Sequence, residues 1–328
     1  MSHGSRYSKT VLELKNLVIE AVEKTLGDSI LLSGGLDTSI VAAVVRSILR
    51  PESDFKAFTI TMRGAPSPDG EYSSIVASKF QIPHHLDSVD IEDLEDELPQ
   101  VISVLGSFDP MEIRNSVATF LGMKKARAEG YSKIMTGDAS DELFAGYDFV
   151  FKKPEQEAME TLSHLWKVMH FSSISLAKSL EMEARLPFLY PPLVKYATTQ
   201  IDFSLLVGLR DGQSFGKYIL RQAFENLLPP SITWRIKTPI EFGSGTTILP
   251  KLYSRTIPDS QFIDKRKKYF ERDHVRLRDK EQLKYYEIFR RVNGPPSTIN
   301  QNARACPACN SNVPDDATFC RTCGEYPI

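Results

Sequence analysis

A short segment near the amino end of the chain combines two glycines with hydroxyl and carboxylate side chains. Residues 33–39 read SGGLDTS, between an apolar run and an alanine- and valine-rich stretch. Glycines let an anion approach the backbone, hydroxyls donate to its oxygens, and Asp37 suits a magnesium ion better than a bare anion. The pattern therefore predicts a phosphate-binding turn, although a tight turn without a ligand has the same composition. It has neither the lysine of a Walker-type loop nor the spacing of a dinucleotide fingerprint.

The cysteines form a second candidate site. All four lie near the carboxyl end, as Cys306 and Cys309, ten residues, then Cys320 and Cys323. Two such pairs are typical of a closed tetrahedral zinc site, which supplies folding energy to a segment with few apolar side chains. Two disulfides or an iron site are the alternatives. A closed site leaves no position for catalysis, so we expect this segment to contact a partner protein, a carrier protein or RNA, or to stabilise the chain end.

The elements that must position these residues alternate between strands and helices as far as residue 136. The alternation predicts an α/β fold, a parallel sheet flanked by helices. Residues 155–252 are expected to be mostly helical, and residues 294–297 read as a linker to the small zinc ribbon. The expected strands are 29–32, 55–62, 84–89 and 131–136, and the expected helices are 11–25, 38–49, 72–80, 91–105 and 113–129.

Composition excludes several classes of protein. The chain has 328 residues, 41% of them apolar, and 40 basic against 42 acidic side chains, so it is not a wholly basic nucleic-acid binder. No run approaches the roughly 18 apolar residues of a membrane span and no secretion signal is evident, so we expect a cytoplasmic protein without a membrane partner. Residues 264–291 interleave basic and aromatic side chains, which fits RNA contact or a charged, solvated helix.

Four segments in order resemble a known family. They are SGGLDTS at 33–39, TGDASDELFAGY at 136–147, LEMEARLPFL at 180–189 and LPPSITWRIK at 228–237. The first resembles the pyrophosphate-binding loop of the N-type ATP pyrophosphatases. Together they resemble the synthetase domain of asparagine synthetase and its β-lactam-forming relatives. The resemblance implies an adenine nucleotide alpha hydrolase-like fold of the HUP type over residues 1–255, followed by a basic, aromatic helical segment at 256–300 and the four-cysteine zinc ribbon at 301–328.

The resemblance also implies a reaction. A carboxylate, aspartate being the first to test, attacks the α-phosphorus of ATP to give an acyl-adenylate and pyrophosphate, and an amine then displaces AMP. By the same resemblance Asp37 and Asp141 hold Mg²⁺, Lys237 stabilises the transferring phosphate, and Arg114 lies near the substrate. Taken singly, Asp141 also reads as a helix cap and Lys237 as a solvated lysine. The residues implied for ATP and pyrophosphate are Leu31, Ser33, Gly34, Gly35, Asp37, Thr38, Ser39, Ile60, Thr136, Gly137 and Asp141.

The chain departs from the family pattern in two respects. Asp138 stands where asparagine synthetases usually have a glutamate that assists the nitrogen step as proton acceptor, which withdraws the carboxylate by one methylene. The cysteines lie only at the far end, so a glutaminase cysteine is not expected. Nitrogen would come from ammonia, a separate glutaminase subunit, an amine in the substrate or a carrier, and GSGTT at 243–247, similar to the β-lactam branch, keeps the substrate amine open.

Two other functions remain open. The same adenylating chemistry could act on a tRNA or a carrier-bound acid that the zinc ribbon recognises. Alternatively, the chain could bind nucleotide as a non-catalytic scaffold. The complete glycine turn and the paired aspartates argue against this alternative.

Overall fold

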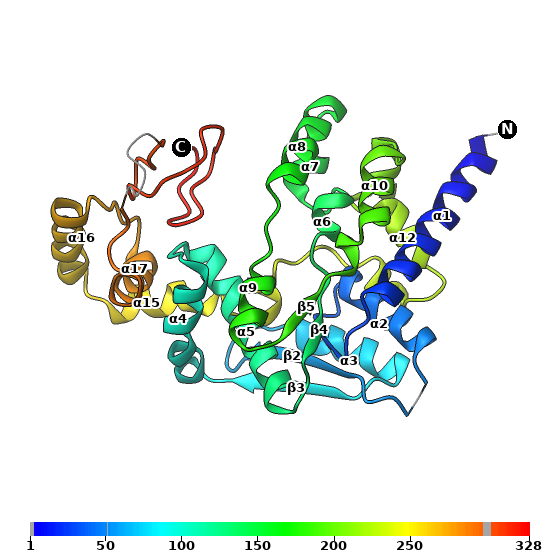
Figure 1. Ribbon diagram of the computed structural model, residues 1–328, viewed down its shortest axis with the longest axis horizontal. Coiled ribbons are helices and arrows are strands. Elements are labelled where there is room, and N and C mark those ends of the chain that lie inside the picture. Colours follow the sequence, from blue (N-terminus) through cyan, green and yellow to red (C-terminus); the bar gives the residue numbers. More distant parts are fainter. Residues whose placement is uncertain (1–2, 51, 298–302) are drawn as a thin grey trace. The chain divides into compact units, whose positions relative to one another are not determined.

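Two compact units make up the chain, and the computed structural model describes residues 3–50, 52–297 and 303–328 (Figure 1). The first unit contains Met1–Thr59, Pro68–Asp87 and Gly122–Thr238, and the second contains Ile60–Ser67, Ser88–Leu121 and Pro239–Ile328. The division into domains at residues 255 and 300 stays a prediction.

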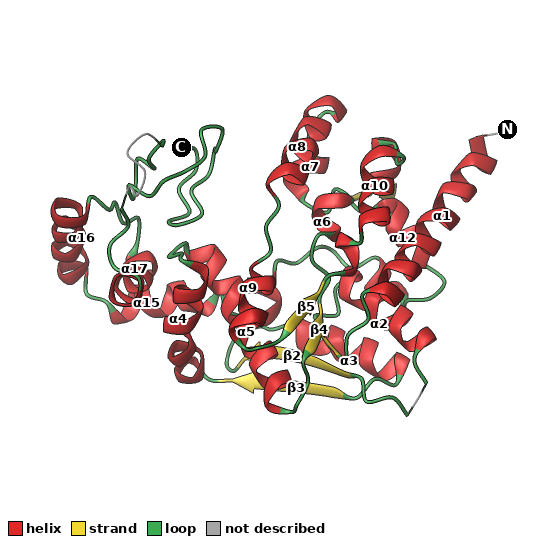
Figure 2. Cartoon of the chain, viewed as in Figure 1, coloured by secondary structure: helices red, strands yellow, loops and turns green. Residues whose placement is uncertain are grey.

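A five-stranded sheet carries the loops of interest (Figure 2). Its order is β3-β2-β1-β4-β5, and β1 pairs in parallel with β2 and β4, as does β4 with β5. The order changes direction between β1 and β4, and the loops that leave such neighbouring strands open a crevice at their carboxyl ends. The strands are β1 (Ser29–Leu31), β2 (Lys56–Met62), β3 (His84–Val89), β4 (Lys133–Met135) and β5 (Glu183–Arg185).

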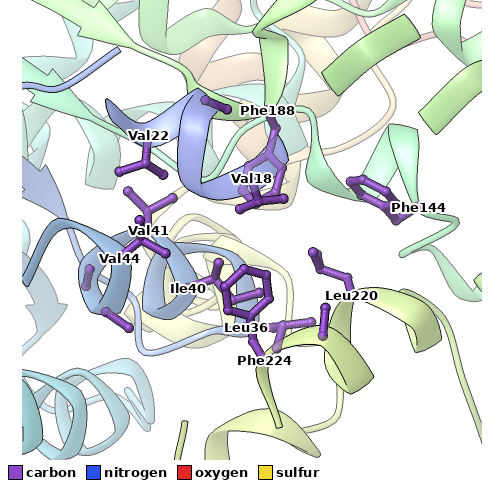
Figure 3. Close-up of a cluster of buried hydrophobic side chains, with 14 of the residues drawn as sticks. Val18, Val22, Leu36, Ile40, Val41, Val44, Phe144, Phe188, Leu220 and Phe224 are labelled. Atoms are coloured by element: carbon purple, nitrogen blue, oxygen red, sulfur yellow. The ribbon is translucent and has the colours of Figure 1, made fainter. Parts of the chain in front are cut away.

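Helices bury the first unit's core. α1 (His3–Lys24), α2 (Leu36–Ile48) and α12 (Tyr218–Phe224) supply most of the side chains that Figure 3 shows converging, among them Val18, Ile40 and Leu220. α2 is apolar nearly all round, as a helix buried on several sides must be. The unit's other elements are α3 (Asp69–Phe80), α6 (Ser140–Leu143), α7 (Asp148–Phe151), α8 (Glu155–Val168), α9 (Ser172–Ser179), η1 (Pro187–Leu189), α10 (Pro191–Thr199), α11 (Phe203–Leu206), the hairpin β6 (Gly208–Arg210) and β7 (Gln213–Phe215), and α13 (Pro230–Thr233).

The second unit is mainly helical. α4 packs along α17, which also contacts α15 and α16, and Phe108, Tyr285 and Tyr286 are fully buried there. α5 runs from this unit into the first. The helices are α4 (Ile91–Leu105), α5 (Pro110–Ala128), α14 (Ile240–Ser244), α15 (Ile248–Thr256), α16 (Asp259–Asp273) and α17 (Lys280–Val292).

The observed elements confirm the expected α/β fold with a parallel sheet. Each of the four expected strands and five expected helices is present, with differences at their ends. β5 and the β6–β7 hairpin were not expected, because they lie in the stretch predicted to be mostly helical. No helix in the described part of the chain is both long and apolar enough to cross a bilayer.

Candidate functional site

The glycine turn joins β1 to α2. Gly34 has φ of +65°, and a Cβ there would collide with the backbone of Tyr72 and Ser73, so the position requires glycine. The Ser33 and Thr38 hydroxyls lie 3.2 Å apart. The Ser39 hydroxyl, in the first turn of α2, is buried and has no hydrogen-bond partner among the described residues. An unpartnered hydroxyl in the first turn of a helix fits an oxyanion ligand.

Four charged side chains converge beside this turn. Asp37 Oδ2 lies 2.6 Å from Lys217 Nζ, which also lies 2.8 Å from Asp141 Oδ1. Lys237 Nζ lies 2.6 Å from Asp141 Oδ2. Ser140 donates a hydrogen bond of 2.7 Å to Asp37 Oδ1. The structure thus brings together Asp37, Asp141 and Lys237, as the resemblance implied, and adds Lys217.

Neighbouring charges govern the pKa values of Asp141 and Lys237. Burial alone would raise the pKa of Asp141, but the ammonium groups of Lys217 and Lys237 outweigh it and hold that pKa well below its usual value. Burial would likewise lower the pKa of Lys237, but the carboxylates of Asp141 and Asp37 raise it. Asp141 and Lys237 are therefore both charged at neutral pH. The two carboxylates of the cluster offer the oxygen ligands that Mg²⁺ takes, so the residues fit that ion.

Lys217 belongs to the charged cluster but was not predicted as a site residue from the sequence. Its side chain is 4% exposed, and its φ of +56° places a non-glycine residue in the left-handed region. Its amide donates to the carbonyl of Phe144, and the end of its side chain lies against Gly146, where a Cβ would overlap Asp141. Backbone strain of this kind persists where the surroundings fix it, and it is concentrated at functional sites.

Asp138 follows β4 and accepts hydrogen bonds from two hydroxyl groups. Thr136 and Ser173 donate to the same Oδ2 atom, at 2.9 and 2.5 Å. Burial raises the pKa of Asp138, and the hydrogen bonds from Ser173 and Thr136 oppose that rise. A carboxyl group with a raised pKa is a better proton acceptor than an ordinary aspartate.

Arg235 ties the segment before Lys237 to the glycine turn. Its guanidinium donates to the Ser33 carbonyl at 3.1 Å and to Asp69 Oδ1 at 2.8 Å. It also lies 4.0 Å from the centroid of the Tyr72 ring. Burial raises the pKa of Asp69, and the hydrogen bond and charge of Arg235 oppose that rise. Arg235 is therefore placed to hold the backbone around the turn, without itself belonging to the charged cluster.

The other implied nucleotide residues lie on the strands that flank the turn. Leu31 ends β1, and Thr136 follows β4, where its amide donates to the Arg185 carbonyl at 3.0 Å. Gly137 packs so closely on Asp37 and Thr38 that a Cβ would displace them. Within the first unit, these residues therefore surround the turn.

Ile60 and Arg114 belong to the second unit. Ile60 is a buried residue of β2. Arg114 Nε lies 2.5 Å from Glu241 Oε2, and Nη1 lies 2.6 Å from Glu281 Oε2. Two carboxylates already pair this guanidinium, so a substrate carboxylate would have to displace one of them. Its role near the substrate stays a prediction.

The four cysteine sulfurs gather at one point in the second unit. All are buried and unbridged, and they lie within 4.8 Å of one another. Cys306 and Cys323 are 3.7 Å apart, as are Cys309 and Cys320. A tetrahedron of thiolates bonded to zinc at about 2.3 Å has edges of about 3.8 Å, so the four side chains fit that ion.

The basic, aromatic segment is largely accounted for by packing. Tyr269, Tyr285, Tyr286 and Phe289 are buried, and each makes a ring contact with another aromatic side chain, whereas Phe270 is 48% exposed. The interleaved rings therefore follow from helix packing, and the stacking platform that RNA contact would need is reduced to one ring.

Comparisons with known proteins identify relatives of this chain. The family model described as asparagine synthase matches residues 13–177 and 174–291. Glutamine-hydrolyzing asparagine synthetase 1 of Lotus japonicus is 30% identical over 70% of this chain and 41% of its own length. Asparagine synthetase B of Escherichia coli is 27% identical over 87% of this chain and 54% of its own. The chain thus spans about half the length of the curated relatives it matches.

A solved NMN synthetase from Francisella tularensis covers 87% of this chain and 93% of its own, at 14% identity. Its TM-score of 0.38 is too low for the likeness to bear on function.

Proposed function

Since the chain belongs to the asparagine synthase family, we propose that it is an ATP-dependent ligase that adenylates a carboxylate and then forms an amide. The observation that carries the proposal is the meeting of Asp37, Asp141, Lys217 and Lys237 beside a glycine turn at the carboxyl end of β1. Family membership supports the reaction class. Aspartate is the first carboxylate to test, because the similar relatives are asparagine synthetases.

In the first step the substrate carboxylate attacks the α-phosphorus of ATP, the bond to the β-phosphate oxygen breaks, and pyrophosphate leaves. A bound Mg²⁺ would neutralise charge on the pyrophosphate, with Asp37 and Asp141 as its ligands. We assign Lys217 and Lys237 as hydrogen-bond donors to phosphate oxygens when Asp37 and Asp141 bind the cation. The Ser39 hydroxyl, which lacks a partner among the described residues, would donate a hydrogen bond to pyrophosphate.

In the second step an amine attacks the acyl carbon and AMP leaves with the bonding electrons. The nitrogen must lose a proton, and we assign Asp138 as its acceptor; the hydrogen bonds from Thr136 and Ser173 that fix this carboxylate support the assignment. The amine is free ammonia, the product of a separate glutaminase, an amine of the substrate or a carrier-bound group.

An ATP–pyrophosphate exchange assay tests the first step without knowledge of the amine. We expect aspartate-dependent exchange that is lost in Asp37→Ala and Lys237→Ala. Asp148→Ala is a matched control, because Asp148 is exposed and its ion pair is with Lys152, one helical turn away. Exchange that depends on another carboxylate would replace aspartate as the substrate. Absence of exchange with every carboxylate, in a preparation that still binds ATP, would contradict the proposed reaction.

A further inference from the structure

The turn that carries the second cysteine pair is hydrogen-bonded to the connection between α4 and α5. The Phe108 amide donates to the Thr322 carbonyl at 2.7 Å, and the Ser107 hydroxyl donates to the Arg321 carbonyl at 2.8 Å. Phe108 itself is fully buried against Tyr286 and Phe289 of α17, with ring centroids 5.1 Å apart in both pairs. These two hydrogen bonds link the cysteine turn to residues about 214 positions earlier in the chain.

The amino-terminal end of α17 holds the same turn from a second side. The Gln282 side-chain amide donates to the Cys323 carbonyl at 2.8 Å, and this hydrogen bond is buried. Arg278 donates to the Gly324 carbonyl at 2.9 Å and to the Cys323 carbonyl at 3.2 Å. Gly324 has φ of +74°, and a Cβ there would overlap the Asp109 carboxylate. The turn therefore fits closely against the α4–α5 connection and the start of α17.

The first cysteine pair is attached to the same region. The Arg276 amide donates to the carbonyl of Ala308, which lies between Cys306 and Cys309, at 2.7 Å. Both halves of the sulfur cluster thus rest on one helical scaffold, although zinc ribbons generally can fold on their metal alone.

We propose that Ser107, Arg278 and Gln282 complete the outer sphere of this metal site, so that metal binding orders the α4–α5 connection as well as the cysteine segment. Mutation of the groups that hold metal ligands in place commonly lowers metal affinity about 10- to 100-fold. Here Ser107, Arg278 and Gln282 donate hydrogen bonds to carbonyls of the turn that carries Cys320 and Cys323. The hydrogen bonds that Ser107 and Phe108 donate also fix these two residues of the α4–α5 connection.

The ordering of the chain that metal binding brings about extends from the α4–α5 connection into α5. Asn115 Oδ1 accepts from the Glu241 amide at 2.9 Å, and the Arg114 carbonyl accepts from the Thr246 hydroxyl at 3.1 Å. The start of α5 thus holds residues 241–246, which follow Lys237 closely in the sequence. Metal occupancy would therefore order residues 241–246 of the second unit as well, without taking part in chemistry.

Zinc affinity of the full chain, measured by competition with a chromophoric chelator, tests the outer sphere. We expect Gln282→Leu and Arg278→Met to weaken zinc binding about 10- to 100-fold. Arg276→Met is the matched control, because its guanidinium faces the Phe270 ring while its amide still bonds to Ala308. Equal zinc affinity in the wild type and all three variants would overturn the proposal. Ser107→Ala, a smaller change, gives a second measurement should the larger variants fail to fold.

Hydrogen exchange tests the ordering. We expect zinc to slow exchange of the amides of Phe108 and Arg276, which bond to the cysteine segment, and of the first turn of α5. Slowing confined to residues 303–328 would show that the segment folds alone and would overturn the ordering. Both readouts use zinc alone and no substrate, so their outcome is independent of whether the chain is a ligase.

Discussion

Lys217 holds two carboxylates that would otherwise repel each other. Its ammonium contacts both Asp37 and Asp141 and is almost wholly buried. Removing one member of a buried ion cluster strongly destabilises the protein, because the remaining charges then lack compensation. In the proposed reaction the same ammonium would contact phosphate oxygens while Asp37 and Asp141 bind Mg²⁺.

Lys217→Met should therefore reduce exchange at least ~100-fold, as expected for loss of a charge that stabilises the transition state. It should also lower the free energy of unfolding by about 3–5 kcal/mol, because Asp37 and Asp141 are left facing each other. Exchange assays and chemical denaturation measure the two effects. Lys195→Met, at an exposed lysine of α10, should change neither. Wild-type exchange in Lys217→Met would remove Lys217 from the site.

The ionisation of Asp138 should determine how the rate of amide formation falls at acidic pH. Its pKa is raised by burial, so the carboxylate is protonated, and cannot accept a proton, at a pH where an ordinary aspartate is still charged. The rate should fall as pH drops through that raised pKa. Ser173→Ala removes a hydrogen bond that favours the charged form and should move this fall in rate to higher pH.

The pH profile of amide formation measures this shift. Ser179→Ala is the control, since its hydroxyl bonds to a carbonyl within α9. Asp138→Asn should keep exchange while amide formation falls about 100-fold or more. An unchanged profile in Ser173→Ala, or full amide formation in Asp138→Asn, would assign the proton to another acceptor.

At the scale of elements, Arg235 fastens the segment after α13 to the turn after β1 and to the start of α3. Three different kinds of contact meet in one guanidinium: a stack on Tyr72, an ion pair with Asp69 and a hydrogen bond to the Ser33 carbonyl. Lysine has neither the planar fork nor the stacking surface to reproduce them. The conformation of the glycine turn should therefore depend on arginine here.

Arg235→Met and Arg235→Lys should both raise the KM for ATP about tenfold or more, because the turn loses its support while the reacting groups stay. Steady-state exchange kinetics at varied ATP measure this. Arg210→Met is a matched control, since Arg210 stacks on Trp234 at 4.1 Å and pairs with Glu225, away from the turn. Full rescue by lysine would show that only the charge at position 235 matters.

The sequence predicts elements well where its patterns are local. β1, α2 and β2 follow from apolar runs and the glycine turn, and they are present as expected. β5 has three residues, Glu183–Arg185, two of them charged, so its pairing with β4 has no local apolar signal. A strand this short is stabilised by its neighbour in the sheet, which only the tertiary structure supplies.

The candidate site shows the same limit. Asp37, Asp141 and Lys237 lie in motifs that the resemblance could match. Lys217 lies 180 residues from Asp37 in sequence, in a segment with no motif of its own, and its role depends on a left-handed backbone that residue type does not predict. The resemblance assigns Arg114 to the substrate, but only the structure reveals that two glutamates pair with it. Long-range ion pairs are the part of a site that sequence patterns leave out.

At the scale of the whole molecule, the two units have separate cores and separate candidate ligands. The charged cluster and its turn belong to the first unit, and the cysteine site belongs to the second. A ligand stabilises the unit that binds it by mass action, about 2.7 kcal/mol at a hundred times its Kd. Each ligand should therefore raise the unfolding temperature of the unit that binds it.

Calorimetry should resolve two transitions. MgATP at saturating concentration should raise one by roughly 5–10 °C, and zinc removal by a chelator, in the absence of MgATP, should lower the other. Lys217→Met should weaken the response to MgATP while the response to zinc stays, because the ion pairs of Lys217 are with first-unit residues. A single transition that moves with both ligands would mean that the units unfold together, and metal occupancy would then support the nucleotide site through global stability.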